Sequence, residues 1–234
     1  MTVVPIVLEN QSHILADATL ASYVPAWTTQ LNDHVRAFWP NLPVFALSIG
    51  IIAGSGQRGV YFQDGIPIKS DLGYHDIETG LPIARVDCLA AKNDNYAVSE
   101  ITGHELCEMA VDPDVTNIIT GSWGETLVEI CDLFIMPGMT YHIGGIEVPN
   151  FTTQAFWGIG PAVRLDMKGS LQPGQVYPYL PPAAYVMNKP PGATAWKMGF
   201  STAEVAPEHQ QMAANRAAQS ARCQVLLNRQ SPRS

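Results

Sequence analysis

The segment Gly103-His104-Glu105-Leu106-Cys107-Glu108 contains residue types that can bind a divalent metal ion. Residues four apart lie on the same face of a helix, with their Cβ atoms about 5–6 Å apart. An imidazole and a carboxylate at this spacing can both coordinate one ion, and both are ordinary zinc ligands. The spacing therefore predicts a zinc (Zn²⁺) site with His104 and Glu108 as two of its ligands.

The remaining parts of such a site are expected from Glu105 and from a later segment. In H-E-x-x-H metallopeptidases, the glutamate that follows the first histidine takes a proton from the metal-bound water, and Glu105 occupies this position. A catalytic zinc ion has three protein ligands and one open position. Candidates for the third ligand are Glu125, Glu129 and Asp132. Asp132 is well placed to orient His104 from outside the ligand shell, or alternatively could be the ligand itself.

The helix that carries the motif is expected to begin near residues 96–99 and to end at about Val111, because Asp112-Pro113 stops it. Its two sides differ in polarity, and the charged side is costly to bury unless it is paired or bound to metal. The apolar side contains Val98, Thr102, Leu106 and Met109, and the other contains Ile101, His104, Glu105 and Glu108.

The elements around this helix indicate an α+β fold with a loop-rich C-terminal half. Apolar residues recur at helical spacing over 17–39, with Pro25 at a kink or a helix start and Pro40 at the end. Residues 171–195 are rich in Pro and Gly and are expected to be irregular. Strands are expected over 3–8, 44–53, 72–75, 83–90, 128–135 and 141–148.

Residues Gly54 to Gly59 match G-x-G-x-x-G, the fingerprint of dinucleotide-binding loops. That fingerprint requires a helix to begin there, so that the pyrophosphate can bind at the helix N-terminus. The next residues, 60–65, have the composition of a strand followed by a turn. We therefore reject nucleotide binding and expect a hairpin turn.

Length and composition limit the remaining possibilities. The 234 residues, 47% of them hydrophobic, suffice for one core, and we expect a single metal-binding domain over 1–202 followed by a C-terminal helix and flexible tail over 203–234. The net charge of −8 argues against nucleic acid as a partner. No apolar stretch is long enough to span a membrane, and the N-terminus has no signal-peptide pattern, so we expect a cytoplasmic protein. The sequence does not indicate an oligomeric state.

Several other residues are of types that can do chemistry, but we expect ordinary roles for them. His75, His142 and Tyr141 could bind a substrate, but isolated residues of these types are more often part of a strand or loop. Cys107 and Cys131 could form a bridge or add a metal ligand, but cysteine also packs well as a small hydrophobic residue.

Three motifs resemble a largely uncharacterised family of bacterial and phage proteins with the patterns G-Y-H-D, S-H-E-x-x-E-x-x-x-D-P and E-x-C-D. Here they are Gly73–Asp76, His104–Pro113 and Glu129–Asp132, and the similarity covers roughly residues 15–200. Plant phosphate-induced (exordium-like) proteins share a related layout. One departure is Gly103, where the relatives usually have serine.

The resemblance implies a zincin-like metallopeptidase fold, in which a small mixed sheet packs on the active-site helix. It also implies His104, Glu108 and Glu129 as zinc ligands, Glu105 as general base, and a peptide or protein as substrate. Two other functions remain open: a hydrolase of another amide bond, and a non-catalytic binding or structural module that keeps the metal for stability. The last would suit a phage accessory protein, and virion association would then be expected.

Overall fold

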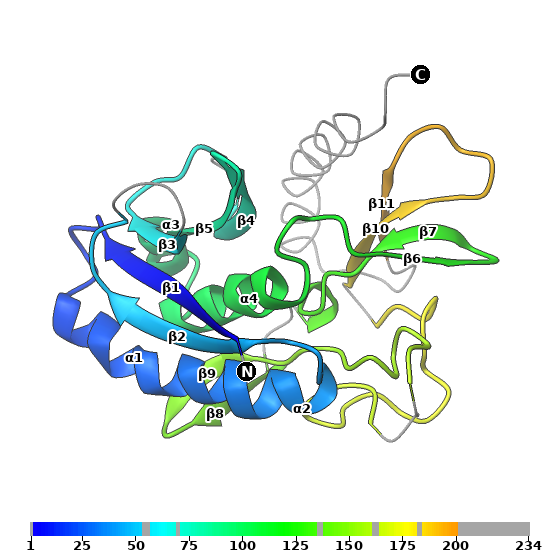
Figure 1. Ribbon diagram of the computed structural model, residues 1–234, viewed down its shortest axis with the longest axis horizontal. Helices are drawn as coiled ribbons and strands as arrows, with labels where there is room; N and C mark the ends of the chain where they lie inside the picture. The colour runs from blue at the N-terminus through cyan, green and yellow to red at the C-terminus, as the bar shows by residue number, and fades with distance from the viewer. Residues whose placement is uncertain are drawn as a thin grey trace.

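The computed structural model describes residues 2–52, 57–68, 71–134, 138–160, 164–181 and 184–200. Helices and strands are mixed along the chain, and the longest helical run lies near the N-terminus (Figure 1). The strands are β1 (Val3–Asn10), β2 (Val44–Ile49), β3 (Arg58–Gln63), β4 (Gly73–Glu78), β5 (Leu81–Asp87), β6 (Ile118–Gly121), β7 (Gly124–Leu127), β8 (Thr140–Ile143), β9 (Ile146–Pro149), β10 (Tyr185–Lys189) and β11 (Lys197–Phe200). The helices are α1 (Asp17–Thr29), the π-helix η1 (Gln30–Val35), α2 (Arg36–Phe38), α3 (Cys88–Asn93), α4 (Val98–Val111) and the 3-10 helix η2 (Asp132–Phe134).

The first sheet has five strands in the order β2-β1-β3-β5-β4. The first four are parallel to one another, and β4 pairs antiparallel with β5 at the edge. Leu8, Val60 and Ala84 lie in register across β1, β3 and β5, and all three are fully buried. Because alternate residues of a strand point to opposite faces, Tyr61 and Arg85 lie on the other, partly exposed face, where Arg85 stacks over the Tyr61 ring.

Two long helical segments pack against this sheet. Helices α1, η1 and α2 form one continuous run from Asp17 to Phe38 beside β2, and α4 lies against β4 and β5 (Figure 1). Trp27 joins the two segments: its ring is fully buried, and its indole Nε1 donates a hydrogen bond to the carbonyl oxygen of Ser99, 2.9 Å away. The core between helices and sheet therefore fixes the position of α4.

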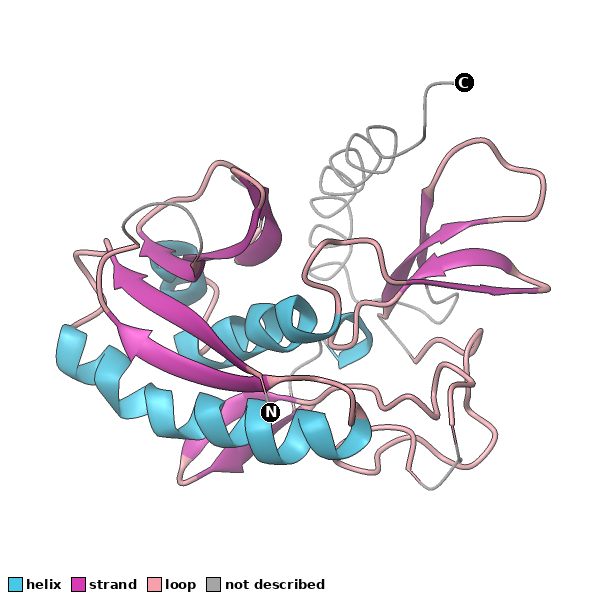
Figure 2. Cartoon of the chain, viewed as in Figure 1, coloured by secondary structure: helices cyan, strands magenta, loops and turns pink. Residues whose placement is uncertain are grey.

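The C-terminal half is built mainly of short strands and loops (Figure 2). Strands β6, β7, β10 and β11 form a second sheet in the order β11-β10-β7-β6, and β8 pairs with β9 in a hairpin that packs on α4. Among the described residues between β9 and β10 there is no helix, and an isolated bridge joins Thr152 to Asp166. The prediction of a loop-rich half is confirmed, although β10 lies within the segment expected to be irregular.

The α+β class, the mixed sheet and the helix that ends before Asp112 agree with the expectations from sequence. The helix expected over 17–39 is present as the run α1-η1-α2, with Pro25 inside α1. The strand expected over 83–90 is β5 only to Asp87, because the Asp87 side chain accepts a hydrogen bond from the Ala90 amide and caps α3.

Three predictions about strands are wrong. The single strand expected over 141–148 is a hairpin, in which β8 and β9 pair antiparallel. The hairpin expected around the G-x-G-x-x-G segment is absent, because β2 and β3 both pair in parallel with β1, which lies between them. Residues 54–56 of the segment itself lie outside the described part of the chain. The strand expected over 128–135 is also absent: β7 ends at Leu127, and η2 begins at Asp132. The segment between them is held by single backbone hydrogen bonds, from Val128 to Asn117 and from Thr152 to Ile130.

No helix in the described part of the chain combines the length and the apolar character that a membrane span requires. The C-terminal helix and tail expected over 203–234 lie outside the described residues.

Candidate metal centre

Helix α4 is buried on nearly all sides, which explains its mostly apolar sequence. It packs against β4 and β5 on one side and against β9 on another. Its end is fixed by Asp112, whose amide donates to the Glu108 carbonyl oxygen over 2.7 Å. The Asp112 carboxylate then accepts hydrogen bonds from the amides of Thr116 and Asn117 and turns the chain toward β6. The motif residues of α4 are thus held inside the protein.

Two glycines allow α4 to approach its neighbours closely. A Cβ atom on Gly103 would lie 2.6 Å from Cδ of Pro149 in β9 and 2.8 Å from Oε1 of Gln30. A Cβ atom on Gly73 of β4 would lie 2.8 Å from Cγ2 of Ile101 and 3.0 Å from Oε1 of Glu105. Glycine at these two positions therefore brings β4 and β9 against the helix that carries the motif.

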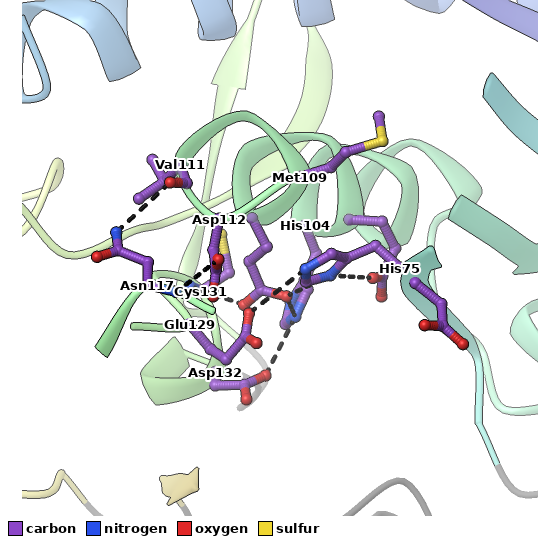
Figure 3. A network of polar contacts seen from close by, with 12 residues as sticks. His75, His104, Met109, Val111, Asp112, Asn117, Glu129, Cys131 and Asp132 are labelled. Carbon is purple, nitrogen blue, oxygen red and sulfur yellow. Dashed lines mark hydrogen bonds and ion pairs between the residues drawn. The ribbon is translucent and has the colours of Figure 1, made fainter. Parts of the chain in front are cut away.

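His104 faces two carboxylates through the same ring nitrogen. Its Nε2 lies 3.1 Å from Oε2 of Glu108, one helical turn later, and 3.2 Å from Oδ1 of Asp132 (Figure 3). Asp132 also accepts a hydrogen bond from the hydroxyl of Tyr185 in β10. Asp132 and Glu108 therefore face the same ring nitrogen of His104, Nε2.

His75 of β4 joins the other carboxylates of the cluster. Its Nδ1 lies 3.6 Å from Oε2 of Glu105 and 3.7 Å from Oε2 of Glu108, and its Nε2 lies 3.9 Å from Oε2 of Glu129 (Figure 3). Glu129 precedes Cys131, whose amide donates a hydrogen bond to Oε1 of Glu108 over 3.1 Å. Glu108 therefore lies at the centre, in contact with both histidines and with the segment that carries Glu129.

The cluster is almost closed to solvent. The His104 side chain is 12% exposed. The other members of the cluster are buried: His75, Glu105, Glu108, Glu129 and Asp132. Four carboxylates in a buried volume must be compensated by cations, because an isolated buried charge costs many kcal/mol. A metal ion or protonated histidines can supply that compensation.

The surrounding carboxylates raise the pKa values of both histidines. Burial acts to lower the pKa of His75, but the Glu105 and Glu108 carboxylates outweigh it and raise that pKa to about 9. Burial likewise opposes protonation of His104, and the carboxylates of Glu108 and Asp132 nevertheless raise its pKa well above the usual range. The site thus has a strong affinity for positive charge, and a divalent ion would compete with these protons for the imidazoles.

The donor atoms also have suitable spacing for a metal ion. In tetrahedral coordination with bonds of about 2.1 Å, neighbouring nitrogen and oxygen ligands lie about 3.4 Å apart. One ligand atom from each of His104, Glu108 and Cys131 lies within 4.8 Å of the others, and so does one from each of His75, Glu108 and Glu129. Imidazole and carboxylate donors suit zinc and other first-row divalent ions.

The five residues that the sequence singles out lie in one cluster but divide between the two histidines. His104 contacts Glu108 and Asp132, whereas Glu105 and Glu129 contact His75. Among the described residues, the predicted ligand set of His104, Glu108 and Glu129 is not one of the groups whose ligand atoms all lie within 4.8 Å of one another. Glu125, the other candidate, lies apart on β7 with its side chain partly exposed, and it pairs with Lys189. His142 is exposed on β8, and Tyr141 bonds to His34 through its hydroxyl. Cys107 and Cys131 are free, buried thiols.

His75 is the residue of the cluster for which the expectation from sequence is wrong. The sequence favours an ordinary strand histidine, but His75 lies buried against three of the carboxylates. Its place in the G-Y-H-D motif, two residues after a glycine that permits close approach to α4, is the signal that could have identified it.

No family model matches the chain, no curated protein matches it, and no solved structure matches it. The assignment of a function therefore depends on the residues and their geometry.

Proposed function

We propose that this protein is a zinc-dependent hydrolase of peptide or related amide bonds, built on a zincin-like fold. One observation carries the proposal: His104, Glu105 and Glu108 of a buried helix converge with Glu129 and Asp132 of a distant segment. Four carboxylates buried around two imidazoles are costly without a cation, and a zinc ion accepts both imidazole and carboxylate ligands.

The ligands in this proposal are His104, Glu108 and a third carboxylate from the segment 129–132. Glu129 is the ligand expected from the resemblance, and Asp132 lies within 3.2 Å of the His104 nitrogen. A bound zinc ion would polarise the scissile carbonyl and lower the pKa of a coordinated water. The chain's own contribution is to hold these donors in a dry, preformed arrangement.

Glu105 is the proposed general base. Its carboxylate lies next to the ligand residue His104 in the sequence and packs between α4 and β4, close to Gly73 and His75. From this position it would accept the proton of the attacking water and return it to the leaving nitrogen, as general acid–base catalysis requires. The His75 imidazole, 3.6 Å away, would keep the carboxylate oriented.

Strand β4 provides a place for the substrate. It is the edge strand of the first sheet, and among the described strands it pairs on one side only, with β5. A peptide in extended conformation can pair with such an edge through main-chain hydrogen bonds. Because β4 also carries His75, a peptide on this edge would pass close to Glu105.

Metal content and hydrolysis together test the proposal. Elemental analysis of purified, untagged protein is expected to find bound zinc in the wild type and a loss of it in His104→Ala. Glu105→Gln is expected to retain the zinc and to lose hydrolysis of a casein-derived peptide mixture. Glu125→Gln, which changes a partly exposed glutamate from the same segment as Glu129, is the matched control and should retain both. Full hydrolysis by Glu105→Gln would refute the role of Glu105.

The burial of the cluster also favours a second candidate, a structural metal in a non-catalytic binding or phage accessory protein. Structural zinc sites are closed, and five of the six cluster residues are buried. In that case, no substrate in the panel is cleaved, and Glu105→Gln behaves as the wild type. His104→Ala would then lower the melting temperature without affecting any activity.

A further inference from the structure

Two groups of potential ligands occur in this cluster, and they share one residue. His104 and Glu108 form one group with Cys131, and His75 and Glu129 form the other, again with Glu108. Oε2 of Glu108 lies 3.1 Å from Nε2 of His104 and 3.7 Å from Nδ1 of His75. One carboxylate therefore lies between two imidazoles that come from different elements, α4 and β4.

The buried Nε2 atom of His75 is independent evidence for a bound ligand. Nε2 of His75 has no hydrogen-bond partner among the described residues, and the nearest carboxylate oxygen in an ion pair with it, on Glu129, is 3.9 Å away. A buried polar atom without a partner costs about 1–3 kcal/mol. The gap is too long for a hydrogen bond but suits two ligands on one ion, because such ligands lie about 3.4 Å apart.

The charges of the cluster also favour more than one ion. Glu105, Glu108, Glu129 and Asp132 carry four negative charges when they are ionised, and the two histidines are neutral when they bind metal. A single divalent ion would balance two of the four negative charges and leave the rest to a protonated histidine, whereas two divalent ions would balance all four. An uncompensated charge has a high free-energy cost when it is buried.

We infer that the protein holds a second divalent ion between His75, Glu108 and Glu129, so that Glu108 is shared by two ions. The inference rests on the proposed metal site at His104, which it extends from one ion to two. It assigns His75 as a ligand and gives Glu129 to the second ion, which leaves Asp132 or Cys131 to complete the first. Two metal ions that share a carboxylate typically lie roughly 3.5–4 Å apart and can together clamp a reacting group.

The first test is a metal stoichiometry. Chelator-treated protein would be titrated with zinc alone and followed by calorimetry, with elemental analysis of the dialysed complex. The wild type is expected to bind two equivalents, and His75→Ala one. His142→Ala, which removes an exposed histidine, is the matched control and should still bind two. Circular dichroism would establish that each variant is folded.

The second test needs no variant. Loading the wild-type protein with manganese(II) alone allows electron paramagnetic resonance to report whether two ions are coupled through a shared ligand. A spin-coupled spectrum that saturates at two equivalents is expected. Uncoupled signals at two equivalents would overturn the assignment of Glu108 as a shared ligand.

The other outcomes separate this inference from the proposed function. One equivalent in the wild type, kept in His75→Ala and lost in His104→Ala, overturns the second ion and leaves the hydrolase proposal intact. One equivalent lost in both variants also overturns it, because a single ion then uses both histidines. Absence of any bound ion overturns the inference and the proposed function together.

Discussion

The hydroxyl of Tyr185 in β10 donates a hydrogen bond to Oδ1 of Asp132, the oxygen that faces His104. This contact connects the second sheet to the candidate metal centre across 53 residues of sequence. A tyrosine hydroxyl in this position fixes the carboxylate and supports its negative charge. The second sheet thereby contributes to the centre without supplying a ligand to it.

Replacing Tyr185 by phenylalanine is expected to loosen Asp132. Hydrogen bonds to charged groups contribute about 1.5–3 kcal/mol, and the loss of a group that orients a metal ligand lowers metal affinity by about 10–100-fold. Denaturant unfolding and zinc titration of Tyr185→Phe would measure the two effects. Tyr179→Phe, a partly exposed tyrosine, is the control. If zinc affinity is unchanged in Tyr185→Phe, Asp132 has no part in metal binding.

Gly103 is expected to resist substitution by alanine. Within a helix, alanine is ordinarily more favourable than glycine by about 1 kcal/mol. Here the new Cβ atom would lie 2.6 Å from Pro149 and 2.8 Å from Gln30, whose amide donates to the Pro149 carbonyl. Overpacking of this kind costs about 1–3 kcal/mol. We therefore expect Gly103→Ala to unfold at lower denaturant concentration than the wild type.

Serine at this position should be at least as unfavourable as alanine in this chain. Ala21→Ser, on the exposed side of α1, controls for the added hydroxyl. A more stable Gly103→Ala protein would mean that β9 can move away from α4 at little cost.

Glu100 is expected to make stability depend on pH. Burial and the nearby Glu147 raise the pKa of Glu100 to about 7 in the folded protein, although His104 acts to lower it. In the unfolded chain, the pKa of a glutamate is about 4.3. The folded state thus binds this proton more tightly, and the stabilisation is fully present below about pH 4.3 and is lost as pH rises through about 7.

Glu100→Gln keeps a neutral side chain at every pH and should therefore differ from the wild type only at the alkaline end. At about pH 4 the two proteins should unfold at similar urea concentrations, and at about pH 8 the variant should be more stable by about 1–2 kcal/mol. Asp94→Asn, which changes an exposed carboxylate, should show no such pH-dependent gain. A constant difference between the acidic and alkaline conditions would contradict the prediction.

Zinc is expected to stabilise the folded protein. A ligand that binds only the folded state adds about 2.7 kcal/mol of stability at one hundred times its dissociation constant. Chelator-treated protein should therefore melt at a lower temperature, and the addition of zinc should restore the wild-type value. In His104→Ala, zinc should have a much smaller effect on the melting temperature. An equal shift in both proteins would locate the bound ion elsewhere.

The sequence is informative where local spacing carries the signal. The helix that ends before Asp112 and the approach of His104 to Glu108 both follow from helical geometry, and the structure contains both. Glu129 and Asp132 are found as candidates because they follow the motif helix in one acidic segment, but the sequence does not separate them from Glu125, which lies apart on β7. The strand predicted for that segment is wrong, since its apolar residues, such as Ile130, pack against the core without joining a sheet.

Long-range pairing cannot be predicted from local pattern. The hairpin expected at Gly54–Gly59 is wrong because β1 lies between the two strands, and turn chemistry does not reveal which strands are neighbours. The role of His75 is hidden for the same reason: only the antiparallel pairing of β4 with β5 and its packing on α4 bring that imidazole to Glu108.

The π-helix η1 has a consequence for how this chain tolerates deletions. In η1 the amide of Arg36 bonds to the carbonyl of Leu31, five residues earlier, so each turn contains one residue more than in an α-helix. Deleting a residue there would restore α-helical hydrogen bonds but rotate α1 by roughly 100° relative to α2 and the rest of the fold. Trp27 would then turn away from Ser99. The extra residue sets the helical phase of α1 against the sheet, so homologous chains are expected to conserve the length of this segment more strictly than its composition.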